Sequence, residues 1–246
     1  MVFFNGREPI LRRKQTALDI QDLYGLIKVH WQVGDRVVLS LRYTRIDQVF
    51  VVWAWITAII FGVAQFSGVS WAEQAIAWSA LTAVGIGVMI YLAWFWVAVE
   101  RFRWLIYLWA ALMALGIGLT DFGIFGGMFF GGHVLSLSVV ILMGLCPLWL
   151  GLTAVGYGLM GVGMRSRTFL IAAVLHGLAI PTVMLSPSWQ FLSTGIVMAG
   201  TLALLAEVQW DMRPPQPTAV LSEAERQFNR QQHQQRQLSH TMYRDA

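Results

Sequence analysis

The sequence predicts an all-α, polytopic membrane protein with six transmembrane helices, an amphipathic N-terminal segment and a polar C-terminal tail. Three observations predict this class. Of the 246 residues, 57% are hydrophobic, only 12% are charged, and the apolar residues gather in long blocks. The charged share is about half that of an ordinary soluble domain. A chain with so few charges cannot coat its surface for water, so we expect lipid to surround the blocks.

The segment before the first block, residues 1–47, is basic and mixed in pattern. It holds no apolar run long enough for the core of a signal peptide, so we expect the first membrane helix to direct insertion. Residues 16–28 are compatible with an amphipathic helix, whereas Gly34 and Asp35 indicate a turn before the weakly alternating residues 37–43. We expect this segment to lie along the cytoplasmic lipid surface, with its Lys and Arg side chains toward anionic headgroups. Binding of a partner is the alternative.

The membrane domain, residues 48–211, contains six apolar blocks. A helix that crosses a membrane needs about 17 to 25 residues. The fourth block is longer than this, and Pro147 predicts a kink within it. The blocks cover residues 49–66, 75–99, 104–120, 134–164, 169–185 and 191–206.

The distribution of Lys and Arg predicts the orientation of the helices. Eight of the 17 precede the first block, two lie in the second loop, two in the fourth loop and five after the last block. All fall on one side of a six-helix arrangement, and the positive-inside rule makes that side, with both termini, cytoplasmic. A seven-helix alternative fits three short spans between Trp104 and Met164. It would divide the positive charges almost evenly, so six helices are preferred.

The C-terminal tail, residues 212–246, is polar and rich in Gln. It begins at the helix-breaking sequence Arg213-Pro-Pro-Gln-Pro217, and Ser222 with Glu225 fits a capping box that would start a helix. Few apolar residues follow, so we expect a solvated helix or a disordered chain. The Gln-rich run is a candidate for binding a partner.

One pattern of ten residues occurs three times, at residues 78–87, 109–118 and 149–158. Each copy begins with Trp and ends with Gly-x-Gly. Small residues four apart lie on one helix face and let membrane helices approach closely. Duplication of a helical unit and chance similarity are alternative origins of the pattern. The expected packing pairs are Ala83 and Gly87, Ala114 and Gly118, and Ala154 and Gly158.

Ionisable residues within membrane helices are costly to bury, so each is a candidate for function. His176, near the middle of the fifth block, could bind a ligand, carry a proton or contact a substrate; a neutral imidazole hydrogen-bonded between helices is the alternative. Asp121 and His133 flank a Gly-rich apolar outer loop and could share a proton or a metal, although polar caps explain them more simply. Glu207 is expected at the cytoplasmic interface.

The sequence carries no motif of a known membrane enzyme. It has no P-loop, no His-Glu-x-x-His and no Gly-x-Ser-Gly element of an intramembrane protease. The lysines, Lys14 and Lys28, both precede the spans, which excludes a retinal Schiff base, and the single Cys146 excludes an internal disulfide. His133 and His176 are expected at different depths, which argues against one haem held by both. We predict no catalytic or metal-binding residues and leave the cofactor open.

Three functions remain. The leading hypothesis is a non-catalytic component that associates with a membrane complex or helps to assemble it, with the lipid bilayer and other membrane-protein subunits as partners. The second is a small transporter or channel with His176 on the pathway. The third is a protein that binds a cofactor such as haem or quinone. The net charge of +4 follows from topology and does not indicate nucleic-acid binding.

Overall fold

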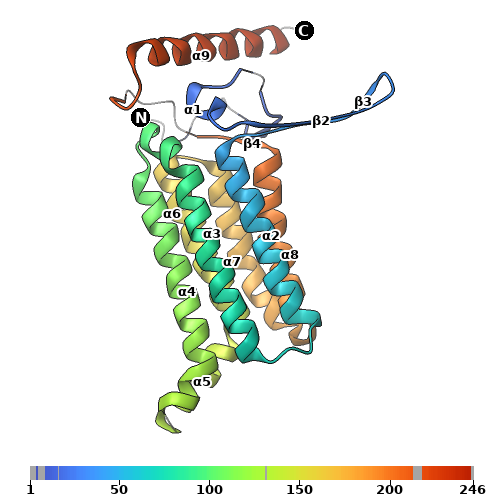
Figure 1. Cartoon of the computed structure of the whole chain (residues 1–246), viewed down its shortest axis with the longest axis vertical. Coiled ribbons are helices and arrows are strands. Elements are labelled where there is room, and N and C mark those ends of the chain that lie inside the picture. The colour runs from blue at the N-terminus through green and yellow to red at the C-terminus, as the bar shows by residue number, and fades with distance from the viewer. Residues whose placement is uncertain (1–3, 5–8, 16, 131, 213–217, 245–246) are drawn as a thin grey trace.

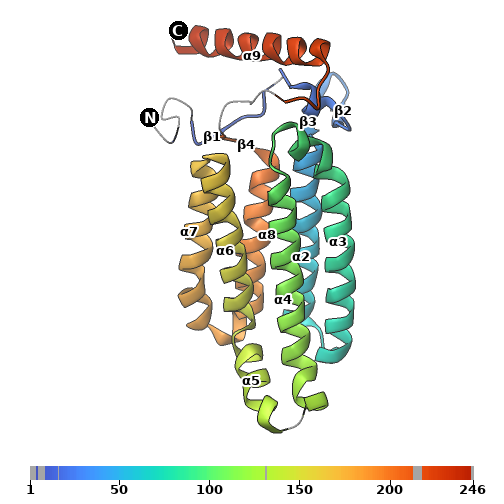
Figure 2. The same cartoon turned by 90° about the vertical axis from the view of Figure 1, so that its left-hand side faces the viewer.

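The computed structural model describes residues 4, 9–15, 17–130, 132–212 and 218–244. Within them, six helices are long and apolar enough to cross a membrane. These helices stand side by side as an upright bundle, and the N- and C-terminal segments gather across one end of it (Figure 1, Figure 2). We call this the terminal end and the opposite one the far end. The six helices suggest a membrane protein, in line with the prediction.

The elements follow the chain in a simple order. The bundle helices are α2 (Arg45–Phe66), α3 (Trp71–Val99), α4 (Arg103–Phe130), α6 (Leu145–Met164), α7 (Arg167–Met184) and α8 (Gln190–Glu207). The remaining helices are α1 (Ile20–Leu23), α5 (Gly132–Met143) and α9 (Glu223–Arg244), with a 3-10 turn at Pro187–Trp189. Strand β1 (Leu11–Arg12) pairs antiparallel with β4 (Gln209–Trp210), and β2 (Ile27–Val33) pairs antiparallel with β3 (Arg36–Tyr43).

Local sequence determines where the first two bundle helices begin. Thr44 and Ser70 precede α2 and α3, and each hydroxyl accepts a hydrogen bond from the backbone N–H three residues further on. The carboxylates of Asp47 and Glu73 accept the backbone N–H of the capping residue in return. Both helices therefore start at complete capping boxes, which satisfy backbone groups that the helix leaves unpaired.

The fourth apolar block forms two helices instead of one kinked span. The break between α5 and α6 falls at Gly144, and Pro147 lies in the first turn of α6. A proline is tolerated there because the first N–H groups of a helix have no partner within it. The structure therefore has a helix break at Gly144, three residues before the position at which the sequence predicted a kink.

The outer loop predicted between Asp121 and His133 is also wrong, because α4 and α5 extend into it from both sides. The two helices run antiparallel and reach past the far ends of their neighbours (Figure 2). Glycines of α4 make room for this contact. A Cβ on Gly126 would lie 2.8 Å from the hydroxyl oxygen of Ser138 in α5.

The N-terminal segment is mainly a β-hairpin, so the helix predicted over residues 16–28 is largely wrong. Within the described residues 17–28, helix is confined to α1, and β2 already begins at Ile27. Residue 16 lies outside the described part. The turn predicted at Gly34 and Asp35 is confirmed, and Gly34 has a φ of +59°. Valine, leucine and tryptophan in alternation favour a strand over the weak helical pattern.

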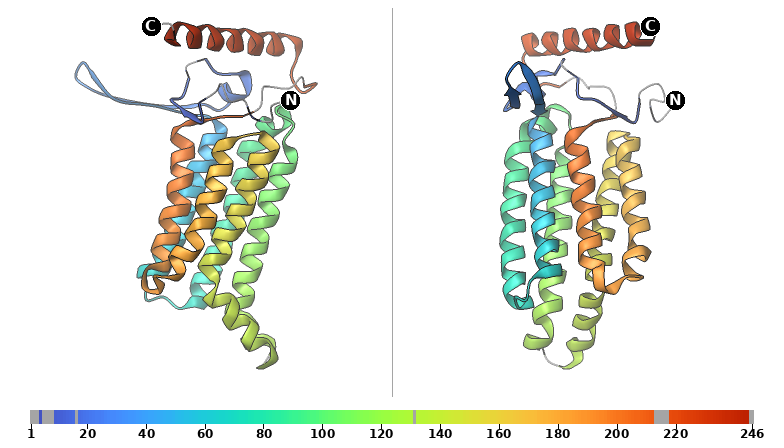
Figure 3. Two further views of the ribbon diagram at one scale, coloured as in Figure 1. Left: turned by 180° about the vertical axis from the view of Figure 1, so that it is seen from behind. Right: turned by 90° about the vertical axis from the view of Figure 1, so that its right-hand side faces the viewer.

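The tail forms a helix, α9, which lies crosswise over the terminal end of the bundle (Figure 1, Figure 3). Its start confirms the predicted capping box: the Ser222 N–H and hydroxyl both donate to the Glu225 carboxylate at 2.7 Å. The predicted breaker at residues 213–217 lies outside the described residues. Of the two expected states, the helix is the one observed over Glu223–Arg244.

The repeated pattern creates a reciprocal contact between α4 and α6. A Cβ on Gly116 would lie 2.7 Å from the Trp149 ring, and one on Gly156 would lie 2.6 Å from the Trp109 ring. Each tryptophan is the first residue of its copy of the pattern, and each glycine is the eighth residue of the other copy. The absent side chains thus form notches that receive the two indoles.

The predicted packing faces therefore differ from the observed ones. Ala154 and Gly158 are half-buried, and a Cβ on Gly158 would make only an ordinary 3.8 Å contact with Ala173 of α7. Within the repeated pattern, the close approaches use the glycine two positions earlier, because that glycine faces an indole. The other four predicted packing residues are exposed: Ala83, Gly87, Ala114 and Gly118.

This packing predicts opposite outcomes for glycines only two residues apart. Gly116→Ala and Gly156→Ala should each destabilise the protein by about 1–3 kcal/mol, because a methyl group must displace an indole. Gly118→Ala and Gly158→Ala are the matched controls and should have little effect. Thermal unfolding in mild detergent measures the difference, and equal melting temperatures for the four variants would contradict the packing.

Candidate functional site

An apolar cavity of about 140 Å³ runs through the bundle. Helices α2, α3, α4, α6 and α8 supply its described lining, and α7 supplies none of it. Along α2 the lining extends from Ile46 to Ala64, which is about 27 Å at the helical rise per residue. Among these lining residues there is no Asp, Glu, Lys, Arg or His. An uncharged cavity of this volume suits a small apolar group, such as part of an acyl chain, better than an ion.

Two tryptophans in the cavity wall have unsatisfied donors. The buried Nε1 atoms of Trp53 and Trp78 have no hydrogen-bond partner within the described part of the chain. By contrast, Trp149 Nε1 donates to the hydroxyl of Thr120 at 3.2 Å. An unsatisfied buried donor costs about 1–3 kcal/mol, so a ligand that carries a carbonyl or ester oxygen would be stabilised beside it.

His176 is fully buried on α7 and does not line the cavity. Its Nδ1 lies 2.8 Å from the carbonyl oxygen of Ala172. Because a carbonyl only accepts, Nδ1 carries a proton, and Nε2 has no hydrogen-bond partner among the described residues. The ring of Tyr157, a cavity residue, packs 5.0 Å from the imidazole. The histidine therefore lies behind the cavity wall.

The structure gives Asp121 a partner inside the bundle. Its carboxylate accepts hydrogen bonds from the hydroxyl of Ser79 in α3 at 3.0 and 3.2 Å. Asp121 belongs to α4 and not to a loop, and its partner also lines the cavity near the far end. The backbone of His133 lies in α5, and its side chain is outside the described part.

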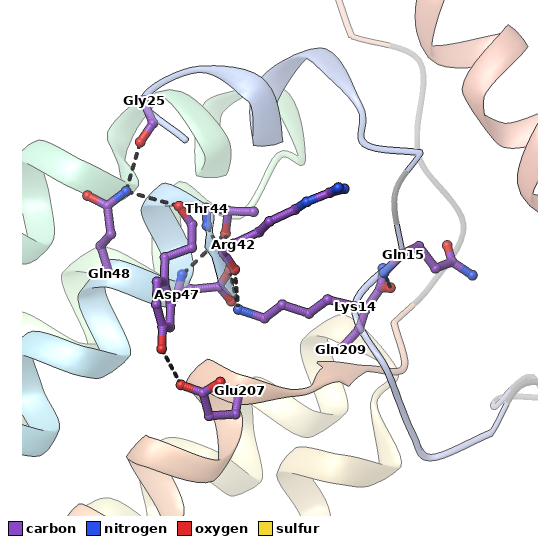
Figure 4. A network of polar contacts seen from close by, with 10 residues as sticks. Lys14, Gln15, Gly25, Arg42, Thr44, Asp47, Gln48, Glu207 and Gln209 are labelled. Carbon is purple, nitrogen blue, oxygen red and sulfur yellow. Dashed lines mark hydrogen bonds and ion pairs between the residues drawn. The ribbon is translucent and has the colours of Figure 1, made fainter. Parts of the chain in front are cut away.

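Glu207 belongs to a polar network at the terminal end (Figure 4). The carboxylate of Glu207, at the end of α8, accepts a hydrogen bond from the Tyr43 hydroxyl. Nearby, Lys14 forms an ion pair with Asp47 at 2.8 Å and donates to the carbonyl oxygen of Arg42 at 2.9 Å. The N-terminal segment, the base of the hairpin, α2 and α8 are thereby joined.

Asp211 connects the chain after α8 to the start of α7. Its buried carboxylate accepts hydrogen bonds from the Ser166 hydroxyl, the Arg167 guanidinium and the backbone N–H groups of Arg167 and Thr168, at 2.9–3.1 Å. Burial opposes the charged form, but these hydrogen bonds outweigh it and hold the pKa of Asp211 below its ordinary value. The anion also complements the positive N-terminal end of α7.

Helix α9 is fixed to the terminal end by polar contacts with the N-terminal segment. Arg236 of α9 pairs with Asp19 at 2.6 Å, and both side chains are largely buried. Asn229 accepts a backbone N–H from α1 at 2.8 Å and donates to Gln21 at 2.9 Å. Gln21 in turn donates to Glu100, after α3, at 2.8 Å. We call α9, the N-terminal segment and these contacts the cap.

Sequence reasoning did not find the cavity, Asp211 or the cap contacts. Asp19 and Asp211 resemble ordinary interfacial carboxylates in the sequence, and their partners are far away along the chain. The four predicted polar residues remain apart: His176 on α7, Asp121 on α4, His133 on α5 and Glu207 on α8. Within the described ranges, no three His, Cys, Asp or Glu side chains gather as metal ligands.

Comparison with known proteins supplies no function: no family model, no curated protein and no solved structure matches the chain.

The Asp211 cluster predicts a loss of stability in acid. The pKa of Asp211 is lowered from its ordinary 3.8. Its contribution to the free energy of unfolding is therefore complete at a pH above 3.8 and is lost as the pH falls through the folded-state pKa. Asp211→Asn should cost about 3 kcal/mol at neutral pH and lessen the acid loss. Thermal unfolding across pH measures both effects. The control is Asp35→Asn in the exposed hairpin turn, and a variant at Asp211 that behaves like this control would contradict the account.

For the cap we predict the opposite pH dependence to that of the Asp211 cluster: its stability falls as the pH rises. Burial, and then the neighbouring carboxylates of Asp19 and Glu100, raise the pKa of Asp22 from 3.8 to about 7. The contribution of Asp22 to the stability of the cap is therefore fully present below pH 3.8 and is lost as the pH rises through about 7. Proteolysis of α9 should become faster between about pH 5 and about pH 8, and Asp22→Asn should abolish the change. An unaltered pH profile in that variant would refute the assignment to Asp22.

Proposed function

We propose that the protein is a multi-pass component of the cell membrane, with both termini in the cytoplasm, that works without catalysis. Its role is to associate with a larger membrane complex or to help assemble it. The observation that carries this proposal is the cap, because it holds a polar helix in a fixed position on the cytoplasmic end of the bundle.

The cap holds α9 by specific polar contacts. Over the part of α9 whose side chains are described, Glu223 to Arg236, Phe228 is the one large apolar residue, and the contacts to the N-terminal segment come from Asn229 and Arg236. Burying an ion pair such as Arg236 and Asp19 adds little net stability, but it specifies one geometry. A fixed position of α9 supports a role in which a partner protein recognises this helix.

The outer face of α9 is well suited to recognition by another protein. Exposed residues recur along it at helical spacing, and apart from Ala224 and Glu223 they are amide or guanidinium groups: Gln227, Arg230, Gln231, Gln234 and Gln235. These side chains donate hydrogen bonds readily and contribute no apolar patch that would favour non-specific association. A helix presented in this way supports docking of a partner from the cytoplasm.

The proposed orientation rests on charge. The turns at the terminal end hold Arg101 and Arg165, and helices α2, α4 and α7 begin there with Arg45, Arg103 and Arg167. The described turns at the far end contain no Lys or Arg. The positive-inside rule places the basic end in the cytoplasm.

The cavity favours a second candidate function, binding of an apolar chain such as an acyl or isoprenoid group, which includes the tail of a quinone. Its length along α2, its apolar wall and the unsatisfied indoles of Trp53 and Trp78 support this reading. The transporter hypothesis has less support, because an uncharged cavity disfavours ions and His176 lies outside its lining.

Native mass tests the leading proposal. The protein extracted gently from its own membranes should carry the added mass of at least one other protein. Truncation after Leu221 should remove this mass, because it deletes α9, whereas His176→Ala should keep it. Native mass spectrometry gives the answer, and a bare wild-type protein would contradict the proposal.

Bound lipid tests the second candidate. Trp53→Phe and Trp78→Phe each remove an indole N–H without emptying the site, so the purified proteins should retain several-fold less of an oxygen-bearing apolar ligand. Trp55→Phe is the matched control, because Trp55 is 67% exposed on the same helix as Trp53. Extraction and mass spectrometry of the bound lipids compares the three. Identical lipid content in all of them would rule out the indole contacts.

A further inference from the structure

The β2–β3 hairpin leaves the terminal end sideways and extends beyond the bundle, crosswise to its helices (Figure 1). Every residue of β2 and the first five residues of β3 are exposed. Two strands alone are marginally stable in water at best. A hairpin that projects in this way is therefore expected to rest on a second surface.

The strand register divides the hairpin into an apolar and a polar face. Side chains of directly opposed residues lie on the same face of a sheet, and successive pairs alternate between faces. The pairs on one face are apolar: Ile27 with Tyr43, Val29 with Leu41, and Trp31 with Leu39. The pairs on the other face are polar: Lys28 with Arg42, and His30 with Ser40. The separation is complete up to the bulge after Trp31.

Tyr43 shows which way the apolar face is turned. Its hydroxyl donates to Glu207 at the end of α8, so this face points toward the bundle side of the hairpin. The Arg42 side chain, on the other face, extends away from Glu207 (Figure 4). Only Thr44 separates the hairpin from the first residue of α2. The apolar face is therefore turned toward the level at which the membrane helices begin.

The surroundings of the hairpin base have the character of a membrane interface. Tyr91 of α3 is 70% exposed, and its ring lies 5.6 Å from the guanidinium of Arg45 at the start of α2. Trp94, one turn further on, is 42% exposed. Exposed aromatic residues with basic neighbours are typical of the boundary between headgroups and acyl chains. The apolar face of the hairpin continues this boundary sideways.

We propose that the β2–β3 hairpin lies on the cytoplasmic membrane surface, with Trp31, Leu39 and their apolar neighbours inserted between lipid headgroups. The basic residues Lys28 and Arg42 occupy the opposite face at headgroup level, where anionic lipids attract them. Lipid is the occupant that the geometry favours, because the apolar face is turned toward the bundle side. This role does not depend on which partner α9 binds.

Paired cysteine probes test the proposal in the full-length protein. Cys146→Ala removes the single, buried cysteine. Single cysteines then replace Trp31 or Leu39 on the apolar face and, as matched controls, the neighbouring His30 or Ser40 on the polar face. Each variant is labelled with an NBD fluorophore, reconstituted in vesicles of phosphatidylcholine and phosphatidylglycerol, and titrated with doxyl-labelled lipid. Circular dichroism confirms that each variant keeps its helices.

The proposal predicts several-fold stronger quenching by the doxyl lipid at the Trp31 and Leu39 positions than at the His30 and Ser40 positions. Equal quenching on both faces, or none at the apolar-face positions, would overturn it. Apolar-face probes that are shielded from aqueous iodide yet not quenched by lipid would also overturn it, because they would assign the face to a protein surface or a second copy of the chain.

Discussion

The reciprocal contact of two indoles with two glycines sets the geometry of the bundle. Trp109 lies against Gly156, and Trp149 lies against Gly116, so a side chain at either glycine would prevent α4 and α6 from approaching this closely. The two indoles also form part of the cavity wall. Next to Gly156, the ring of Tyr157 meets Trp109 edge-on at 5.3 Å and the imidazole of His176 at 5.0 Å. One contact thus positions α4, α6, the cavity and the buried face of α7.

The described charged side chains pair at the terminal end of the molecule and not around the cavity. The cavity wall is free of ionisable side chains among its described residues apart from Tyr157. By contrast, the described residues of the terminal end include the buried or half-buried ion pairs of Lys14 with Asp47, Arg167 with Asp211, and Arg236 with Asp19. Such pairs are a weak source of stability but a strong source of specificity. The first joins the N-terminal segment to α2, the second joins the chain after α8 to α7, and the third joins α9 to the N-terminal segment.

The sequence was sufficient for the helices because hydropathy over about 20 residues reports directly on membrane helices. The sequence was insufficient to predict secondary structure where one local pattern is compatible with two conformations. Residues 16–28 fit a helix weakly, but only Ile20–Leu23 are helical, and pairing with residues beyond Gly34 makes the chain a strand from Ile27 onward. The glycines after Asp121 suggest a loop, and only the packing of α5 residues such as Leu135, Ser138 and Ile141 against them makes them a helix contact. The partners of Asp19 and Asp211 depend on the tertiary fold, so no local signal could reveal them.

The proposed orientation places both termini of the six-helix bundle, and with them the cap, in the cytoplasm. Reporter fusions at the two ends of the full chain test it most directly, with a fluorescent protein that folds only in the cytoplasm and a phosphatase that is active only outside it. The account predicts that both termini give fluorescence and that neither gives phosphatase activity. Phosphatase activity at one terminus would require an odd number of spans. Phosphatase activity at both termini would place the cap on the opposite side of the membrane. Either result would contradict the proposed orientation.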